Sequence, residues 1–125
     1  MDAHDGMGGV VLVLEDEALI AINLHDDLCE AGYRIAGPFT TCAAALAWLD
    51  QARPDAAILD TELADGTCRD VARVLARRAV PIVIYSGHRR DKDLLAEFDT
   101  AVWIEKPAPS FDLIAACRQL IAATS

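Results

Sequence analysis

Short apolar runs alternate with longer amphipathic segments along the chain. The runs are rich in Val, Ile and Ala, and continuous runs of this kind are typical of strands buried on both faces of a sheet. In the segments between them, apolar residues recur at spacings of three and four, which predicts helices with one buried side. The predicted strands cover 10–14, 33–37, 56–60, 80–85 and 101–104. The predicted helices cover 18–31, 42–51, 67–79, 91–98 and a last segment after Pro109.

Helix-ending and helix-starting residues separate these elements. Gly32 follows the first helix, where a glycine commonly ends a helix. Thr40 or Thr41 is suited to cap the second helix, and Ser110 is suited to cap the last. Asp65-Gly66 predicts a turn before the third helix.

The alternation predicts an α/β fold built from five strand–helix units. Strands that are joined by helical crossovers must be parallel, and five units are too few for a closed eight-stranded barrel. We therefore expect a flavodoxin-like doubly wound (βα)5 domain with strand order 2-1-3-4-5. We expect residues 1–9 to form a flexible tail and residues 10–125 to form this domain, with no output domain.

Composition narrows the class of protein. The chain has 125 residues, and its 20 acidic and 11 basic side chains give a formal net charge of −9. This charge argues against binding to nucleic acid or to an anionic membrane surface, since both require clustered Lys and Arg. No apolar run approaches the roughly 18 residues of a membrane-spanning helix, and the N-terminus does not resemble a signal peptide. These observations favour a cytoplasmic domain.

The four cysteines show no metal-binding or redox spacing. They are Cys29, Cys42, Cys68 and Cys117, and no two lie within four residues of each other. Disulfides are rare without an export signal, so we expect four free cysteines that act as small apolar side chains on helices.

Candidate chemistry gathers where the predicted strands end. Glu15 and Asp16 follow strand 1, Asp60 ends strand 3, Ser86 follows strand 4, and Lys106 follows strand 5. The carboxyl ends of parallel strands meet at one edge of the sheet, so these groups should converge there. Carboxylates this close repel each other unless a cation lies among them, and oxygen ligands favour Mg²⁺. The set predicts a phosphoryl-transfer site.

Asp60 is the best-placed nucleophile of this set, because its strand lies at the centre of the sheet. An attacking carboxylate would form an acyl phosphate. Gly6, Gly8 and Gly9 precede the first strand instead of following it, so they do not form a phosphate-binding loop. This arrangement weakens a kinase or nucleotide-binding interpretation.

Five motifs, each at the end of a predicted strand or in a loop, occur in the order typical of one family. They are Val11-Leu-Val-Leu-Glu-Asp-Glu17, Ile58-Leu-Asp60, Asp65-Gly66, Ser86-Gly87 and Lys106-Pro107. Together they resemble the signature of response-regulator receiver domains of two-component signalling. The resemblance extends from about Val10 to Ala122.

The resemblance implies a role for each matching residue. Asp60 would accept the phosphoryl group. Asp16 would bind Mg²⁺ directly, Glu15 would bind it through a water, and the backbone carbonyl of Glu62 would complete the metal shell. The partner would be a histidine kinase or a histidine phosphotransferase, and the output would be protein–protein contact as a phosphate shuttle, a sink or a binding regulator.

The resemblance also implies how the site would respond to phosphorylation. Lys106 would pair with the phosphoryl group, and its bond to Pro107 would be cis. Ser86 would bind a phosphoryl oxygen and move inward. Trp103 stands where the family commonly has Tyr or Phe as a rotamer switch. The larger indole leaves two interpretations, a switch or an apolar residue that is exposed or faces a partner. Ala108 stands where the family often has Phe.

Val83-Ile-Tyr-Ser-Gly-His88 resembles a subgroup of small receivers with a Phe-Ala-Thr-Gly-Tyr-like motif, which often work with histidine kinases of the HWE type. Glu62 and His88, each two residues past a site residue, are predicted to tune the lifetime of the phosphoryl group. In the family, kinases dock against the first helix, where Ala18, Ala21 and Ile22 are expected to be exposed.

Two other functions fit part of the pattern. One is a Mg²⁺-dependent phosphohydrolase that forms an aspartyl-phosphate, for which Glu62 has the spacing of the second acid; the chain has no room for the cap that such enzymes use. The other is an interaction module that is not phosphorylated. The complete set of Asp16, Asp60, Ser86 and Lys106 argues against the second. A receiver turns over no external substrate, so we do not expect an enzyme.

Overall fold

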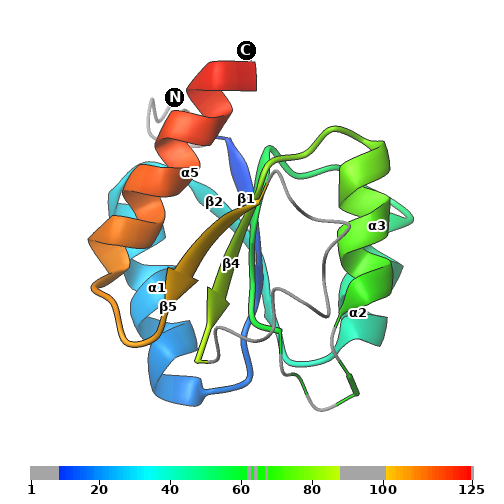
Figure 1. Cartoon of the computed structure of the whole chain (residues 1–125), viewed down its shortest axis with the longest axis horizontal. Helices are drawn as coiled ribbons and strands as arrows, with labels where there is room; N and C mark the ends of the chain where they lie inside the picture. The colour runs from blue at the N-terminus through cyan, green and yellow to red at the C-terminus, as the bar shows by residue number, and fades with distance from the viewer. Residues whose placement is uncertain (1–8, 62, 64, 67, 88–100, 125) are drawn as a thin grey trace.

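A parallel sheet of five strands separates two layers of helices (Figure 1). The computed structural model describes residues 9–61, 63, 65–66, 68–87 and 101–124. The strands lie in the order β2-β1-β3-β4-β5 and each neighbouring pair is parallel, which confirms the predicted doubly wound fold. The strands are β1 (Val10–Leu14), β2 (Arg34–Phe39), β3 (Ala56–Leu59), β4 (Ile82–Ser86) and β5 (Val102–Glu105). The helices are α1 (Ala18–Glu30), α2 (Cys42–Leu49), α3 (Arg69–Arg77) and α5 (Ser110–Thr124).

Each face of the sheet has its own hydrophobic core. Helices α1 and α5 cover one face, and α2 and α3 cover the other (Figure 1). Alternate residues of a strand point to opposite faces. In β1, Val11 and Val13 therefore pack in the α1–α5 cluster, whereas Leu12 and Leu14 pack in the α2–α3 cluster. All four are fully buried, which explains why this central strand has a continuous apolar sequence.

Helix α3 is shorter than the pattern predicts. It begins at Arg69 instead of Thr67 and ends at Arg77 instead of Ala79. Cys68 and Ala79 have φ angles of 63° and 58°, and a residue in this left-handed region does not continue a right-handed helix. Local hydrophobic spacing carries no information about such a conformation.

Several other boundaries differ from the predicted ones by one or two residues. Strand β2 lies one to two residues later than 33–37, and β4 begins two residues later than predicted and includes Ser86. Ser110 is the first residue of α5 and not its cap. The predicted helix at 91–98 lies outside the described residues.

The expectation of four free cysteines is wrong, because a disulfide joins Cys42 to Cys68. Helices α2 and α3 pack together on the same face of the sheet, and this brings the two Cα atoms to 5.4 Å, a usual separation for a disulfide. The two positions are 26 residues apart, so only the fold reveals their proximity. Cys29 is free and exposed, and Cys117 is free and buried as expected.

Candidate functional site

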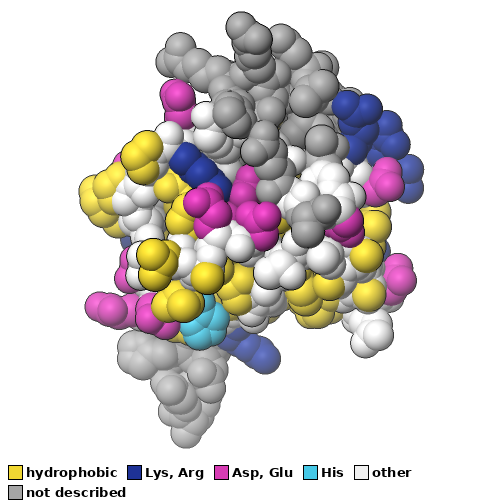
Figure 2. Space-filling view, turned by 90° about the horizontal axis from the view of Figure 1, so that it is seen from below, with side chains coloured by type: hydrophobic (Ala, Val, Ile, Leu, Met, Phe, Trp, Pro, Cys, Tyr) yellow, Lys and Arg dark blue, Asp and Glu magenta, His cyan; other side chains and the backbone are white. Residues whose placement is uncertain are grey.

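Three carboxylates meet at the carboxyl edge of the two central strands. The register of β1 and β3 pairs Leu14 with Leu59, so the next residues, Glu15 and Asp60, lie side by side. One oxygen each from Glu15, Asp16 and Asp60 lies within 4.8 Å of the others. Glu15 and Asp60 are buried, whereas Asp16 is exposed. The view onto this edge shows acidic side chains gathered near its centre, beside a basic one (Figure 2).

Lys106 extends from the end of β5 into this acidic cluster. Its Nζ lies 3.0 Å from Asp60 Oδ2, 3.1 Å from Glu15 Oε1 and 2.8 Å from Glu17 Oε2. The bond to Pro107 is cis, as the resemblance implied. Glu17 was not singled out in the sequence, although it continues the acidic run after strand 1. One ammonium thus faces more carboxylates than it can neutralise, which leaves a site of net negative charge.

Burial and proximity change the acidity of this cluster. Burial raises the pKa of Glu15 to about 7; the nearby Asp60 adds to the rise, while hydrogen bonds from the Glu17 N–H and from Lys106 oppose it. Burial alone would lower the pKa of Lys106, but hydrogen bonds to Glu17, Asp60 and Glu15 raise it above its ordinary value. Lys106 therefore stays charged at every physiological pH. A cation bound among these carboxylates would offset the repulsion between Glu15 and Asp60.

Ser86 lies at the end of β4 with its side chain buried. Its Oγ is 3.0 Å from Thr61 Oγ1, and its carbonyl accepts a 2.8 Å hydrogen bond from the Lys106 N–H. Thr61 was not predicted as a site residue. The only sequence signal was its position directly after Asp60. The contact links the segment that follows β3 to the end of β4.

Tyr85 is a second residue that the sequence analysis missed. Its hydroxyl donates to the Ala108 carbonyl and accepts from the Ala108 N–H, both at 3.0 Å. Its ring centroid lies 5.3 Å from Lys106 Nζ, within the range of a cation–π contact. Tyr85 therefore fixes the turn that carries Lys106.

Of the remaining predicted site residues, the structure describes Trp103 alone. Glu62 and His88 lie outside the described residues. Trp103 is half-buried in β5 and packs against the α2–α3 core.

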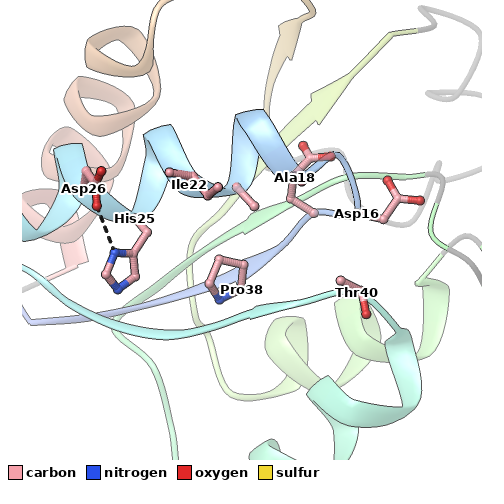
Figure 3. Close-up of a pocket in the computed structure, with 9 residues that line it drawn as sticks. Asp16, Ala18, Ile22, His25, Asp26, Pro38 and Thr40 are labelled. Atoms are coloured by element: carbon pink, nitrogen blue, oxygen red, sulfur yellow. Dashed lines mark hydrogen bonds and ion pairs between the residues drawn. The ribbon is translucent and has the colours of Figure 1, made fainter.

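A cavity of about 430 Å³ opens beside the acidic cluster, between α1 and the end of β2. Figure 3 shows Asp16 at one end and His25 with Asp26 at the other. Ile22 and Ala18 line it and are exposed, as expected. The expectation that Ala21 is exposed is wrong, because this side chain lines the bottom of the cavity and is buried.

A doubly wound sheet with a lysine and several carboxylates at its switch point is the arrangement that the resemblance to receiver domains predicts. The profile of the response regulator receiver domain matches residues 11–118, and the chain belongs to this family. Receiver domains are parts of two-component systems; they bind Mg²⁺ at an acidic site, are phosphorylated on an aspartate, and interact with histidine kinases or phosphotransferases.

Two proteins resemble this chain along most of its length, one in sequence and one in structure. The transcriptional regulatory protein PdtaR from two Mycobacterium tuberculosis strains is 32% identical over 119 residues, which cover 92% of this chain and 58% of that protein. A response regulator receiver protein from Sinorhizobium medicae superimposes with a TM-score of 0.83 at 28% identity, covering 93% of this chain and 96% of the other.

A third relative shares the fold at lower identity. The receiver domain of the sensor histidine kinase PA1611 from Pseudomonas aeruginosa, solved with a magnesium ion in its active-site cleft, has a TM-score of 0.80 at 20% identity, covering 92% and 98% of the two chains. In the described part of the present chain, no helix has the length and apolar character needed to cross a membrane.

Proposed function

We propose that Asp60 accepts a phosphoryl group from a histidine kinase or from a histidine phosphotransferase, with Mg²⁺ as the cofactor. The observation that carries the proposal is the convergence of Glu15, Asp16 and Asp60 within 4.8 Å, with Lys106 Nζ 3.0 Å from Asp60. The donor set consists of carboxylate oxygens, which fits Mg²⁺. The ion would neutralise charge on the transferred phosphoryl oxygens.

The residues have separate roles in the transfer. An Asp60 carboxylate oxygen attacks phosphorus, the bond from phosphorus to the donor atom breaks, and its electron pair leaves with the donor. Asp16 and Asp60 would hold Mg²⁺ directly, Glu15 through a water, and Glu62 through its backbone carbonyl. Lys106 would exchange its contact with Asp60 for one with the phosphoryl group.

Phosphorylation would then change the position of Ser86. Its hydroxyl, which now contacts Thr61, would turn to a phosphoryl oxygen and favour the active member of a two-state equilibrium. We propose that the output is protein–protein contact, as a shuttle, a sink or a binding regulator, and that the donor is a kinase of the HWE type. Trp103 would follow Ser86 as the aromatic switch.

The decisive experiment is phosphorylation with acetyl phosphate and Mg²⁺, followed by mass spectrometry. We expect one phosphoryl adduct that hydroxylamine removes and that is missing in Asp60→Asn. The matched control is Asp50→Asn, which alters an exposed aspartate at the end of α2 and should keep the adduct. If neither acetyl phosphate nor a cognate kinase produces an adduct, the proposal is wrong. Steady phosphate release from unrelated monoesters would favour the phosphohydrolase.

We also propose that Glu62 and His88 set the lifetime of the acyl phosphate by controlling how water reaches it. Replacing both by Ala should change the rate of adduct loss, measured by mass spectrometry after the donor is removed. An unchanged rate in the double variant would refute this role while leaving phosphorylation of Asp60 intact.

A further inference from the structure

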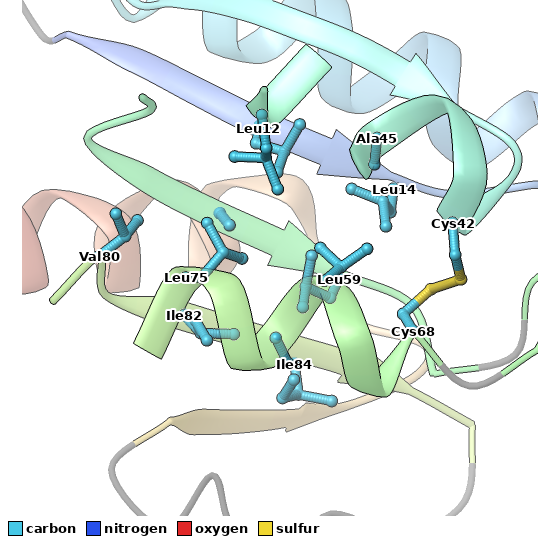
Figure 4. Close-up of a cluster of buried hydrophobic side chains, with 14 of the residues drawn as sticks. Leu12, Leu14, Cys42, Ala45, Leu59, Cys68, Leu75, Val80, Ile82 and Ile84 are labelled. Atoms are coloured by element: carbon cyan, nitrogen blue, oxygen red, sulfur yellow. A yellow bond between two sulfur atoms is a disulfide. The ribbon is translucent and has the colours of Figure 1, made fainter. Parts of the chain in front are cut away.

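Two independent links fasten the segment after β3 to the start of α2. The Asp65 carboxylate accepts hydrogen bonds from the N–H of Cys42 at 2.7 Å and of Ala43 at 3.0 Å. The second link is the disulfide between Cys42 and Cys68, which lies at the end of the α2–α3 core (Figure 4). The first link is reversible in any environment, whereas the second depends on the redox state of the solution.

The other end of this segment lies in the phosphoryl-acceptor site. It begins at Asp60 and Thr61, and the Thr61 hydroxyl contacts the Ser86 hydroxyl in a buried position. In the middle, Leu63 and Gly66 exchange backbone hydrogen bonds of 3.0 and 3.2 Å, and the Leu63 side chain is buried. These hydrogen bonds hold Leu63 and Gly66 together between Thr61 and the disulfide, so the described part of the segment is suited to pass a displacement from one end to the other.

The backbone at Cys68 shows what the disulfide restrains. Its φ of 63° is a left-handed conformation that is unfavourable for a residue with a Cβ. The local sequence instead favours a helix that starts before this position, as the hydrophobic pattern predicted. We expect Cys68, without the bond to Cys42, to relax to a right-handed conformation and to join the first turn of α3.

We propose that Cys42 and Cys68 are a redox modification site that controls phosphoryl acceptance at Asp60. The oxidised pair restrains the segment and slows the change at Thr61 and Ser86 that accompanies phosphorylation; the reduced pair releases it. This inference rests on the proposed function of Asp60. Intramolecular disulfides that form in a reducing compartment are usually transient and respond to oxidants, which is the behaviour such a control requires.

The co-reactant is a low-molecular-weight disulfide such as glutathione disulfide. One protein thiolate attacks it, forming a mixed disulfide and releasing one glutathione thiolate. The second protein thiolate attacks the protein sulfur of the mixed disulfide and releases the second glutathione. Two electrons pass from the cysteine pair to the reagent, and the two protons of the protein thiols go to the released thiolates. Reduction is the reverse reaction.

The other two cysteines supply controls. Cys29 is exposed on α1 and has no disulfide partner. Cys117 is free and buried, and burial raises the pKa of its thiol to about 12, so it remains the unreactive thiol. The effects of reductant on Cys29→Ser and on the double variant Cys42→Ser/Cys68→Ser therefore separate the pair from other thiols.

The test compares the rates of phosphorylation by acetyl phosphate in the oxidised and reduced protein, with the redox state verified by intact mass. We expect reduction to accelerate adduct formation on the order of five-fold. The double cysteine variant should react at the reduced rate with or without reductant, and Cys29→Ser should respond as the unaltered protein does. Equal phosphorylation rates in the two redox states would overturn the inference. So would a response of the double variant to reductant, or failure of the disulfide to form.

Hydrogen exchange distinguishes failure of this inference from failure of the proposed function. Reduction should accelerate amide exchange in the peptide that contains Thr61, Leu63 and Gly66. If no form of the protein gives an adduct, the proposed role of Asp60 fails, and the control of phosphorylation fails with it, whatever the exchange rates. If adducts form but exchange in this peptide is the same in both redox states, only the redox inference is overturned.

Discussion

Lys106 holds together a group of acidic side chains that would otherwise repel each other. Its ammonium contacts Glu15 and Asp60, which are both buried, and the exposed Glu17. Removing one partner from a buried ion pair lowers the stability of a protein more than breaking an exposed pair does, because the remaining charge stays buried without a partner. The contacts with these carboxylates therefore hold the ammonium where a phosphoryl group on Asp60 would need it.

Glu15 should make the stability of the metal-free protein depend on pH. Its folded pKa of about 7 lies above the ordinary 4.5, so its contribution to stability is fully present below pH 4.5 and is lost as pH rises through 7. Relative to Glu15→Gln, the unaltered protein should lose up to about 3 kcal/mol of unfolding free energy between pH 5 and pH 8. Urea unfolding in the presence of a chelator measures this difference. Parallel pH profiles of the two proteins would contradict the prediction.

At the scale of elements, the start of α2 is fixed by both its own cap and a distant loop. Thr41 Oγ1 accepts from the Ala44 N–H at 3.1 Å, as the sequence predicted for one of two threonines. Asp65 accepts from the two preceding amides, although it lies 22 and 23 residues further along the chain. The sequence identified Asp65-Gly66 as a turn but gave no sign of this second cap.

The two caps should respond differently to pH. Hydrogen bonds from the N–H groups of Cys42 and Ala43 hold the pKa of Asp65 below its ordinary value of 3.8. Its contribution to stability is therefore present above pH 3.8 and is lost as pH falls through the folded pKa. Asp65→Ala should destabilise the protein at pH 7 and progressively less in acid. Thr41→Ala should cost about 1 kcal/mol at both pH values. A pH-independent effect of Asp65→Ala in urea unfolding would refute this account.

The disulfide between the starts of α2 and α3 should contribute strongly to stability. It closes a loop whose ends are 26 residues apart, which restricts the unfolded chain and corresponds to about 3.5 kcal/mol. Cys42→Ser/Cys68→Ser should lower the unfolding free energy by about this amount under oxidising conditions and much less under reducing conditions. Cys29→Ser serves as the control and should change little. Equal stability of the oxidised protein and the double variant would contradict the prediction.

The elements and the site differ in how far the sequence could predict them. Apolar runs with no polar interruption, such as Val10–Leu14, were sufficient to predict strands, parallel pairing and the edge where Glu15 and Asp60 meet. The start of α3 could not be predicted, because the φ of Cys68 is set by tertiary structure. Thr61 was missed for the same reason: its contact with Ser86 depends on how two strands are aligned, which hydrophobic spacing does not report.

At the scale of the whole molecule, the acidic cluster lies beside apolar surface. Leu19 and Ile22 of α1 are 78% and 55% exposed, and Phe111 at the start of α5 is 69% exposed. Helices α1 and α5 pack against each other on one face of the sheet. Large exposed apolar side chains near a reactive edge favour a protein contact there. This location agrees with the expectation, drawn from the sequence resemblance, that a histidine kinase docks against α1.

The docking face and the reactive site should be separable by the choice of phosphoryl donor. Leu19→Ala and Ile22→Ala remove exposed apolar surface without altering the acidic cluster, so phosphorylation by acetyl phosphate should keep its rate. Transfer from the cognate kinase should slow about ten-fold, because loss of about 1.4 kcal/mol of contact corresponds to that factor. The matched control is Ala47→Ser, an exposed position of α2 on the opposite face of the sheet, which should leave both rates unchanged. If the variants react more slowly with both donors, these side chains take part in the transfer step itself. If both rates are unchanged, the kinase does not bind at this part of α1.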